Sequence, residues 1–284
     1  MKRNVRKKSA GTKGLGFRGS EEKTSRTWKK QTALALLFSC AAGCSGYSVS
    51  CYKDGIRAGE NKFMVSTQSY DSSTRGKAVA VANRLLEPCD GDGFPEETGW
   101  ESAAALQFNT DWRGKNPNPA RETEVRLLWT PETLFLRFRA KYHTITVFPD
   151  TEPNGRRDKL WDRDVVEAFL QPDRSNLRRY KEFEVSPNGF WIDLDIAPGE
   201  KHDLKSGLKR RVRLDEAKKT WTAELAIPMK CLVKRFDRAT AWGVNFYRVE
   251  GAEEPRFYSA WQPTGTAVPN FHVPEAFGEL VFAP

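Results

Sequence analysis

The sequence has few of the residues that hold metal ions or carry redox chemistry. Its 284 residues include only three His and three Met, and none of its five Cys are spaced as CxxC. His143, His202 and His272 are far apart along the chain. Because structural zinc sites use closely spaced Cys and His ligands, the sequence gives no sign of a zinc site, and we predict no cofactor.

An excess of one charge is also missing from most of the chain. The formal net charge is +9, but the first 30 residues contain eleven Lys or Arg and two Glu, so the other 254 residues hold 35 basic and 35 acidic side chains. A nucleic-acid-binding domain needs a basic field to displace counterions from phosphates. The basic run at residues 209–213 fits one charged face of a strand. The sequence therefore argues against a nucleic acid as partner.

The chain has no apolar run long enough to cross a bilayer as a helix. Residues 33–44 follow the basic N-terminus and end in small residues, which is the order of a secretory signal. Ala41-Ala42-Gly43-Cys44 resembles a bacterial lipobox, in which the Cys becomes lipidated, and Cys40 is the alternative acceptor. A buried core helix is the other interpretation. We expect residues 1–44 to be a basic leader and lipoprotein-type signal sequence, and the mature protein to be a periplasmic or cell-surface lipoprotein anchored to a membrane.

Residues 45–76 are polar and contain few large apolar side chains, so they are predicted to form a tether ahead of one folded domain, residues 77–284. Export would favour disulfides and would leave Cys51, Cys89 and Cys231 as an odd set. One pair and one free thiol are allowed, and the spacing does not select the pair.

From residue 77 onward, short segments with a two-residue period are separated by Pro, Gly, Asn and Asp. Residues 133–140 are apolar at every even position, whereas Arg137 and Arg139 face the other way. We predict an all-β, antiparallel two-sheet β-sandwich of the immunoglobulin or jelly-roll kind, with little helix beyond a turn at residues 229–233. The predicted strands are about ten: residues 124–129, 133–140, 165–170, 180–185, 190–196, 208–214, 221–227, 241–249, 256–261 and 279–282.

The chain contains nine Trp, and most of them are expected in the core. Core positions on alternating strands are predicted for Trp100, Trp129, Trp221 and Trp242. Trp161 differs because charged residues surround it on both sides. Two interpretations are open: an exposed ring that stacks on a ligand, or a lid packed over a sheet edge.

An ordered set of blocks runs through the predicted domain: Gly91-Asp92-Gly93 with Trp100, residues 123–136, Leu160 to Leu170, Trp221 to Pro228, Trp242 to Phe246, and Trp261 with Phe277-Gly278-Glu279-Leu280. Together these blocks resemble the family 9 carbohydrate-binding modules over residues 77–284. The resemblance implies a non-catalytic monomeric sandwich that holds a glycan between two aromatic rings with polar contacts, in polysaccharide recognition or breakdown.

The resemblance also implies a set of site residues. By position, Trp161 corresponds to the first aromatic clamp and Glu167 to a nearby sugar-binding acid, while Asn245 stands where the family has a polar strand residue. Phe271 stands where the second clamp would be Trp, and Glu184 where a positively charged contact is expected. These two departures bear on which ligand is bound.

The residues support part of this assignment on chemical grounds alone. Glu167 lies in an apolar strand, where a buried carboxylate needs either an ion pair, for which Arg137, Arg139 and Arg248 are candidates, or a ligand. His272 follows Phe271 in a Pro-rich loop that would present a ring and an imidazole beside Trp161; a C-terminal strap is the alternative for that segment. Residues 150–152, Asp162 and Asp164 supply oxygen ligands for Ca²⁺, but without a fixed-spacing motif.

Two other classes of function were compared with sugar binding. A glycoside hydrolase would pair Asp164 with Glu167, but residues three apart on a regular strand face opposite ways, so a loop carboxylate would have to replace one of them. A haem-binding sandwich would need axial ligands such as Met229 and His272 in a deep apolar pocket.

Overall fold

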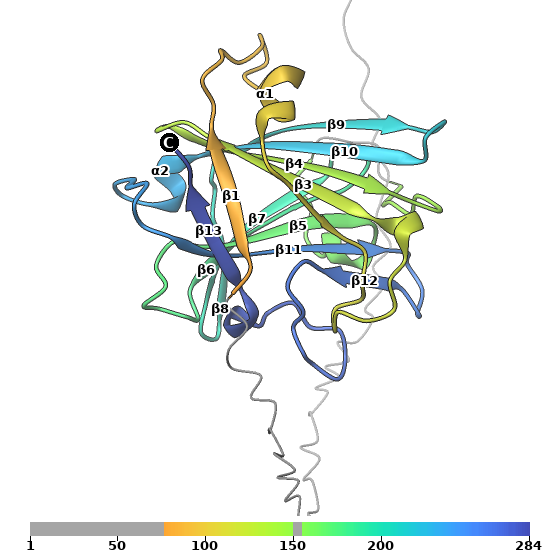
Figure 1. Ribbon diagram of the computed structural model, residues 1–284. Coiled ribbons are helices and arrows are strands. Elements are labelled where there is room, and N and C mark those ends of the chain that lie inside the picture. Colours follow the sequence, from red (N-terminus) through yellow and green to blue (C-terminus); the bar gives the residue numbers. More distant parts are fainter. Residues whose placement is uncertain (1–76, 150–154) are drawn as a thin grey trace, which may run out of the picture. The chain divides into compact units, whose positions relative to one another are not determined.

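The computed structural model describes residues 77–149 and 155–284, and nearly all of the regular secondary structure in them is β-strand (Figure 1). The strands are β1 Val79–Arg84, β2 Ala105–Phe108, β3 Thr123–Trp129, β4 Thr133–Lys141, β5 Val165–Gln171, β6 Tyr180–Val185, β7 Trp191–Ala197, β8 Glu200–Asp203, β9 Lys209–Asp215, β10 Thr220–Pro228, β11 Trp242–Glu250, β12 Phe257–Ala260 and β13 Gly278–Phe282. The α-helices are α1 Glu97–Ser102 and α2 Met229–Leu232, and single 3₁₀ turns occupy Pro119–Arg121, Leu160–Asp162 and Pro274–Ala276.

These strands form one curled, mixed sheet instead of two separate antiparallel sheets. The order is β8-β7-β6-β5-β11-β13-β1-β3-β4-β10-β9, with β12 beside β11 and β2 beside β3. Strand β1 runs parallel to both β13 and β3, and the other pairings are antiparallel. The all-β prediction is confirmed, whereas the expectation of two purely antiparallel sheets is wrong because β1 joins them.

Each of the ten predicted strands corresponds to a strand of the structure, but β1, β2 and β8 were missed. In β1 the large apolar Val79 is 47% exposed, while the small Ala80 and Ala82 are fully buried. A two-residue period is recognised when large apolar residues are buried and polar residues are exposed, and β1 does not have this pattern. Every residue of β8 is exposed, so its sequence carries no alternation.

The two ends of the curled sheet face each other across the main core. In Figure 1 the strands β3, β4, β9 and β10 form one layer, and β5, β6, β7 and β11 form the other. The rings of Phe138 on β4 and Phe246 on β11 meet across this core with centroids 5.9 Å apart. The core positions predicted for four Trp are confirmed, since Trp100, Trp129, Trp221 and Trp242 are all at most 3% exposed.

Alternation along β5 and β6 creates a second, outer face that is rich in carboxyl groups. Val166 and Ala168 on β5, and Phe183 on β6, point into the main core. The residues between them therefore point outward. This outer face is covered by the segment around Phe271, where two smaller hydrophobic clusters form.

The predicted leader and tether, with Cys40, Cys44 and Cys51, lie outside the described residues. Within the described residues, Cys89 and Cys231 are free thiols. None of the described helices combines the length and the apolar character that a membrane span requires.

Candidate functional site

A hollow of about 250 Å³ opens on the outer face of β5 and β6, and we call it the outer hollow. Four of the five predicted site residues line it, namely Trp161, Glu167, Phe271 and His272. Its other lining residues are Glu182, Glu184, Lys201, Val249, Arg256, Tyr258, Pro269 and Asn270. Segments that are distant in the sequence thus meet at one place.

Trp161 lies at one side of the outer hollow in the short turn Leu160–Asp162. Lys159 begins this turn in the left-handed region (φ 56°), and the fully buried Leu160 anchors it. The Trp161 carbonyl oxygen accepts a hydrogen bond of 2.8 Å from Arg256, and the ammonium of Lys201 lies 3.9 Å from the Trp161 ring centroid. The turn is therefore fixed, while the ring is only half-buried.

Phe271 is held by two tyrosines. Its ring stacks on Tyr247, with centroids 4.2 Å apart and planes inclined by 12°. Tyr258 meets it edge-on at 6.2 Å. The next residue, His272, places Nδ1 2.7 Å from the hydroxyl of Tyr180, and burial of the ring lowers the His272 pKa. The imidazole is therefore expected to be neutral at pH 7.

Asn245 does not line the outer hollow but supports it from below. It is fully buried, and its amide nitrogen donates to the Tyr247 hydroxyl at 2.8 Å and to the Gln262 carbonyl at 2.9 Å. Its amide oxygen accepts from the Gln262 main-chain nitrogen at 2.9 Å. The structure thus places Asn245 as a support for Tyr247, without access to a ligand in the hollow.

Glu167 is one of three carboxyl groups that lie together in the hollow. It is directly opposite Glu184 on the neighbouring strand, and Glu182 shares their face. Burial, and then the negative charge of a neighbouring carboxyl group, raises the pKa of Glu167 and of Glu184 well above the usual range.

The ion pair considered for Glu167 is not formed. Arg137 pairs instead with Glu224 at 2.7 Å, and Arg248 pairs with Glu250 at 2.8 Å. Arg139 lies on the outward face of β4, in the other layer of the sheet, and forms no ion pair with any described residue. The interpretation of Glu167 as a partner of one of these arginines is therefore wrong.

Asp164, the other carboxylate of the hydrolase interpretation, lies outside the hollow. Its carboxylate accepts main-chain hydrogen bonds from Thr146 at 3.1 Å and from Gly251 at 2.6 Å. Burial raises its pKa to about 6. Asp164 therefore holds two loops and does not face Glu167 across a ligand space.

The residues considered for haem and for Ca²⁺ do not assemble in the described part of the chain. Met229 is buried at the main core beside a different hollow from that of His272. Asp150 and Glu152 lie outside the described residues. Among those that are described, no three His, Cys, Asp or Glu side chains are grouped so that they could hold a metal ion.

Sequence reasoning missed several lining residues. The family resemblance placed Glu184 at the site but did not single out Glu182, although both alternate with apolar residues in the predicted strand 180–185 and therefore share a face. Their proximity to Glu167 depends on the pairing of β5 with β6, which the sequence does not specify. Lys201 lies in the missed strand β8, and Arg256 immediately before β12; neither carries a local signal.

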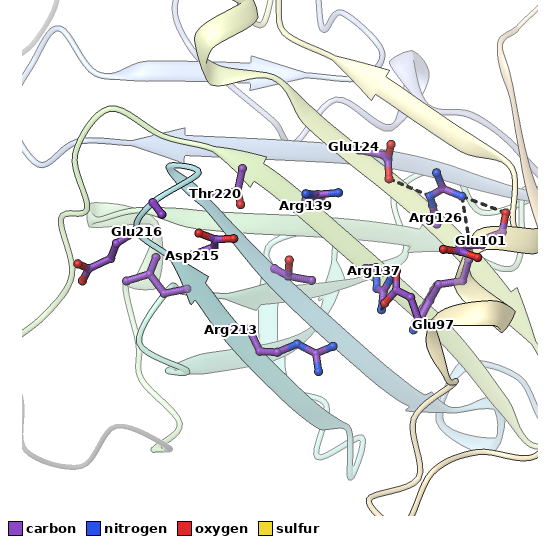
Figure 2. A pocket seen from close by; sticks show the side chains of 14 residues that line it. Glu97, Glu101, Glu124, Arg126, Arg137, Arg139, Arg213, Asp215, Glu216 and Thr220 are labelled. Carbon is purple, nitrogen blue, oxygen red and sulfur yellow. Dashed lines mark hydrogen bonds and ion pairs between the residues drawn. The ribbon is translucent and has the colours of Figure 1, made fainter.

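A larger hollow of about 1020 Å³ covers the outward face of the opposite layer, over β3, β4, β9 and β10 (Figure 2). Two ion pairs join its charged side chains: Arg126 pairs with Glu124 at 2.8 Å, and Arg137 pairs with Glu97 at 2.6 Å. Its one lining aromatic residue, Trp100, is fully buried. This larger hollow therefore lacks the exposed ring that the outer hollow has.

Comparisons with known proteins agree with the geometry. The family model described as "Carbohydrate family 9 binding domain-like" matches residues 90–283. A proposed carbohydrate-binding protein from Bacteroides uniformis is similar in fold, with a TM-score of 0.59 and 18% identity over 73% of this chain and 100% of that one. A family 9 carbohydrate-binding module from Caldicellulosiruptor kristjanssonii, solved with cellotriose, has a TM-score of 0.51 and 17% identity over 72% of this chain and 94% of that one.

A curated relative gives a sequence match of the same extent. An extracellular protein of Arthroderma benhamiae is 26% identical over 196 residues, which are 63% of this chain and 86% of that protein.

Proposed function

Because the chain belongs to the carbohydrate family 9 binding domain-like family, we propose that it binds a glycan in the outer hollow without cleaving it. The observation that carries this proposal is the convergence of Trp161, Glu167 and Phe271 on that hollow. These residues come from a turn, a strand and a C-terminal loop, and together they offer two rings and a carboxyl group to one ligand.

The chemistry of the hollow suits a sugar. A sugar ring has C–H groups on its faces and hydroxyls around its rim. The rings of Trp161, Tyr258 and Phe271 provide apolar surface for the faces, and the charged side chains provide strong hydrogen bonds for the rim. The volume of about 250 Å³ falls just below the roughly 300–1,000 Å³ of pockets for drug-sized ligands. It therefore suits one sugar ring or a chain end.

Calorimetric titration of the full chain with glucose, cellobiose and cellotriose tests the proposal. Glucose and cellotriose are chosen because similar solved structures contain them. Trp161→Ala removes one ring from the hollow and should weaken binding by about 1–3 kcal/mol, as for a buried aromatic anchor. Sugar products are assayed in the same samples, and release of glucose from cellotriose would contradict a non-catalytic role.

Trp191→Ala is the matched control. Trp191 is also half-buried beneath a cation, with Arg210 5.1 Å from its ring centroid, but it does not line the hollow. Melting curves of both variants separate lost stability from lost binding. The proposed site is refuted if the two variants bind equally, and sugar binding is refuted if the wild-type chain binds none of a broader set of mono- and oligosaccharides.

We also propose that the chain is exported and lipid-anchored, and that it serves the recognition or breakdown of polysaccharides outside the cytoplasm. The order of basic leader, apolar run and small residues before Cys44 supports export. The polar stretch at residues 45–76 would then give a lipid-anchored domain reach toward extended glycans.

A further inference from the structure

The three carboxyl groups of the outer hollow are nearly inaccessible. Glu167, Glu182 and Glu184 are exposed by 3%, 2% and 0%. One carboxyl oxygen of Glu167, one of Glu182 and both of Glu184 have no hydrogen-bond partner among the described residues. Like charges that are directly opposite on neighbouring strands destabilise a sheet, and a buried carboxylate needs a partner. These carboxyl oxygens therefore lack a direct partner within the described residues.

Two buried carboxylates elsewhere in this chain, Glu224 and Glu250, have a compensating charge beside them. Glu224 is fully buried and pairs with Arg137 at 2.7 Å and with Arg213 at 2.9 Å. Glu250 is 2% exposed and pairs with Arg248 at 2.8 Å. Arginines thus pair with Glu224 and Glu250, and main-chain N–H groups donate to the buried Asp164, whereas the carboxyl oxygens of the outer hollow named above have neither kind of partner.

The cations around the hollow are directed elsewhere. Lys201 places its ammonium over the ring of Trp161, and Arg256 donates to the main chain of the same residue. The imidazole Nδ1 of His272 is 4.0 Å from a carboxyl oxygen of Glu182, at the limit of an ion pair. Within residues 77–149 and 155–284, no Lys or Arg forms an ion pair with any of the three carboxyl groups.

We propose that the outer hollow takes a sugar bearing a protonated amine, of the hexosamine class, whose ammonium lies among Glu167, Glu182 and Glu184. This inference rests on the proposed function and adds the charge of the ligand to it. An ammonium has three donors and no acceptor, so it can donate to each of three carboxylates. Trp161 and Phe271 contact the apolar face of the same ring. A neutral sugar could form hydrogen bonds with the protonated carboxyl groups but could not stabilise their ionised form.

Ionisation of the carboxyl groups should be linked to binding. Burial and mutual repulsion raise the pKa of Glu167 and of Glu184, so the empty hollow keeps protons that an ammonium would displace. Binding should therefore release protons wherever the carboxyl groups of the empty hollow are still protonated. Affinity should rise with pH until the amine of the ligand itself loses its proton.

Other titratable and charged groups face the carboxyl cluster, but they change little in this range. Burial lowers the pKa of His272 and raises the pKa of each tyrosine, so these groups are neutral at pH 7 and above. The full set comprises Tyr180 on β6, Lys201 on β8, Tyr247 on β11, Arg256 before β12, Tyr258 on β12 and His272 in the loop.

The test is titration of the full chain with glucosamine, N-acetylglucosamine and glucose at pH 7. Glucosamine should bind about tenfold more tightly than the other two, because charge-assisted hydrogen bonds are roughly twice as strong as neutral ones. N-acetylglucosamine keeps the ring but has no charge. Heats measured in two buffers with different ionisation enthalpies should reveal proton release with glucosamine alone.

Glu184→Gln removes one carboxyl group from the cluster and should reduce the preference for glucosamine over glucose at least severalfold. Glu275→Gln is the matched control, because it makes the same charge change at an exposed position outside the hollow and should keep the preference. If the Glu184 variant does not fold, the binding heats of the wild-type chain in the two buffers still test proton release.

Each remaining outcome is decisive. Equal binding of glucose and glucosamine overturns this inference and leaves the proposed function intact. Failure of all sugars, including cellotriose, overturns both. Binding of Ca²⁺ that depends on Glu184, without a preference for glucosamine, overturns the inference in favour of a metal site.

Discussion

The hydroxyl of Tyr247 donates to the main-chain oxygen of Phe271 at 3.0 Å, while the rings of the two residues stack. Tyr247 in turn receives a hydrogen bond from the buried amide of Asn245. A residue of a central strand thus fixes a residue of a loop through both its ring and its main chain. The predicted site residues Asn245 and Phe271 are linked through Tyr247, which the sequence did not single out.

Tyr247→Phe should loosen the loop at Phe271. The variant keeps the stacked ring but leaves the Phe271 carbonyl without this donor and Asn245 without this acceptor. Loss of a hydrogen bond between neutral groups typically destabilises by about 0.5–1.5 kcal/mol. We expect a lower melting temperature and a severalfold weaker affinity for cellotriose. Unchanged affinity in a destabilised variant would show that the loop position does not matter for binding.

Phe271→Trp should retain or improve glycan affinity. The larger indole offers more apolar area to a sugar face and restores the residue that the family resemblance leads one to expect. Phe271→Ala is the reference for loss of the ring. Calorimetry on the three proteins gives their order of glycan affinity. A Trp variant that binds as poorly as the Ala variant would show that Phe271 is not part of the site.

Glu184→Gln should stabilise the protein increasingly as pH rises. Because the folded pKa of Glu184 is raised, its contribution to stability is fully present below the unfolded pKa of about 4.3 and is lost as pH rises through the folded pKa. Glutamine has no such loss. The two proteins should melt alike near pH 4, and the variant should melt higher at pH 8. A difference in melting temperature that is independent of pH would contradict the raised pKa.

Glu224→Gln should strongly destabilise the opposite layer of the sheet. The substitution deprives Arg137, Arg211 and Arg213 of a shared anionic partner, and removal of one member of a buried ion pair costs on the order of 3–5 kcal/mol. The exposed Glu216 serves as control and should change the free energy of unfolding by less than about 0.5 kcal/mol when replaced by Gln. Equal effects in chemical denaturation would show that the arginines do not depend on Glu224.

Expression in a bacterium should yield a chain that has lost its basic leader and carries lipid on Cys44, or on Cys40 if Cys44 is not used. Intact-mass analysis of the membrane fraction measures both changes. Cys44→Ala should abolish the lipid mass, with Cys40→Ala as the matched control. An unmodified chain beginning at Met1 in the soluble fraction would contradict the predicted signal.

Sequence patterns predicted the strands and their buried faces well where large apolar side chains alternate with charged ones. Leu134, Leu136 and Phe138 alternate with arginines, so the inward face of β4 was evident. In β1 the buried residues are alanines, so the one strand that joins the two ends of the sheet gave no signal. Without β1 among the predicted strands, the sequence predicts two separate sheets where the structure has one curled sheet.

The sequence predicted the aromatic residues of the site, but it did not predict the carboxyl cluster or Arg256. Charged residues flank Trp161 in the sequence, which indicates that its ring is not fully buried. The family resemblance placed Glu167 and Phe271 at the site. The carboxyl cluster depends on which residue of β6 is opposite Glu167, and period-two alternation fixes a face but not a partner strand. Arg256 reaches Trp161 across the fold and carries no local pattern.

The outer hollow has a floor that is made by paired strands and walls that are made by a turn and a loop. The carboxyl groups of Glu167, Glu182 and Glu184 project from paired strands whose main-chain hydrogen bonds do not involve them. Trp161 and Phe271 come from a turn and a loop. A substitution in the floor can therefore change the charge of the accepted ligand while the backbone stays fixed, whereas a substitution in the walls alters how tightly a ring of any charge is held. Ligand selectivity and affinity can thus evolve separately in this fold.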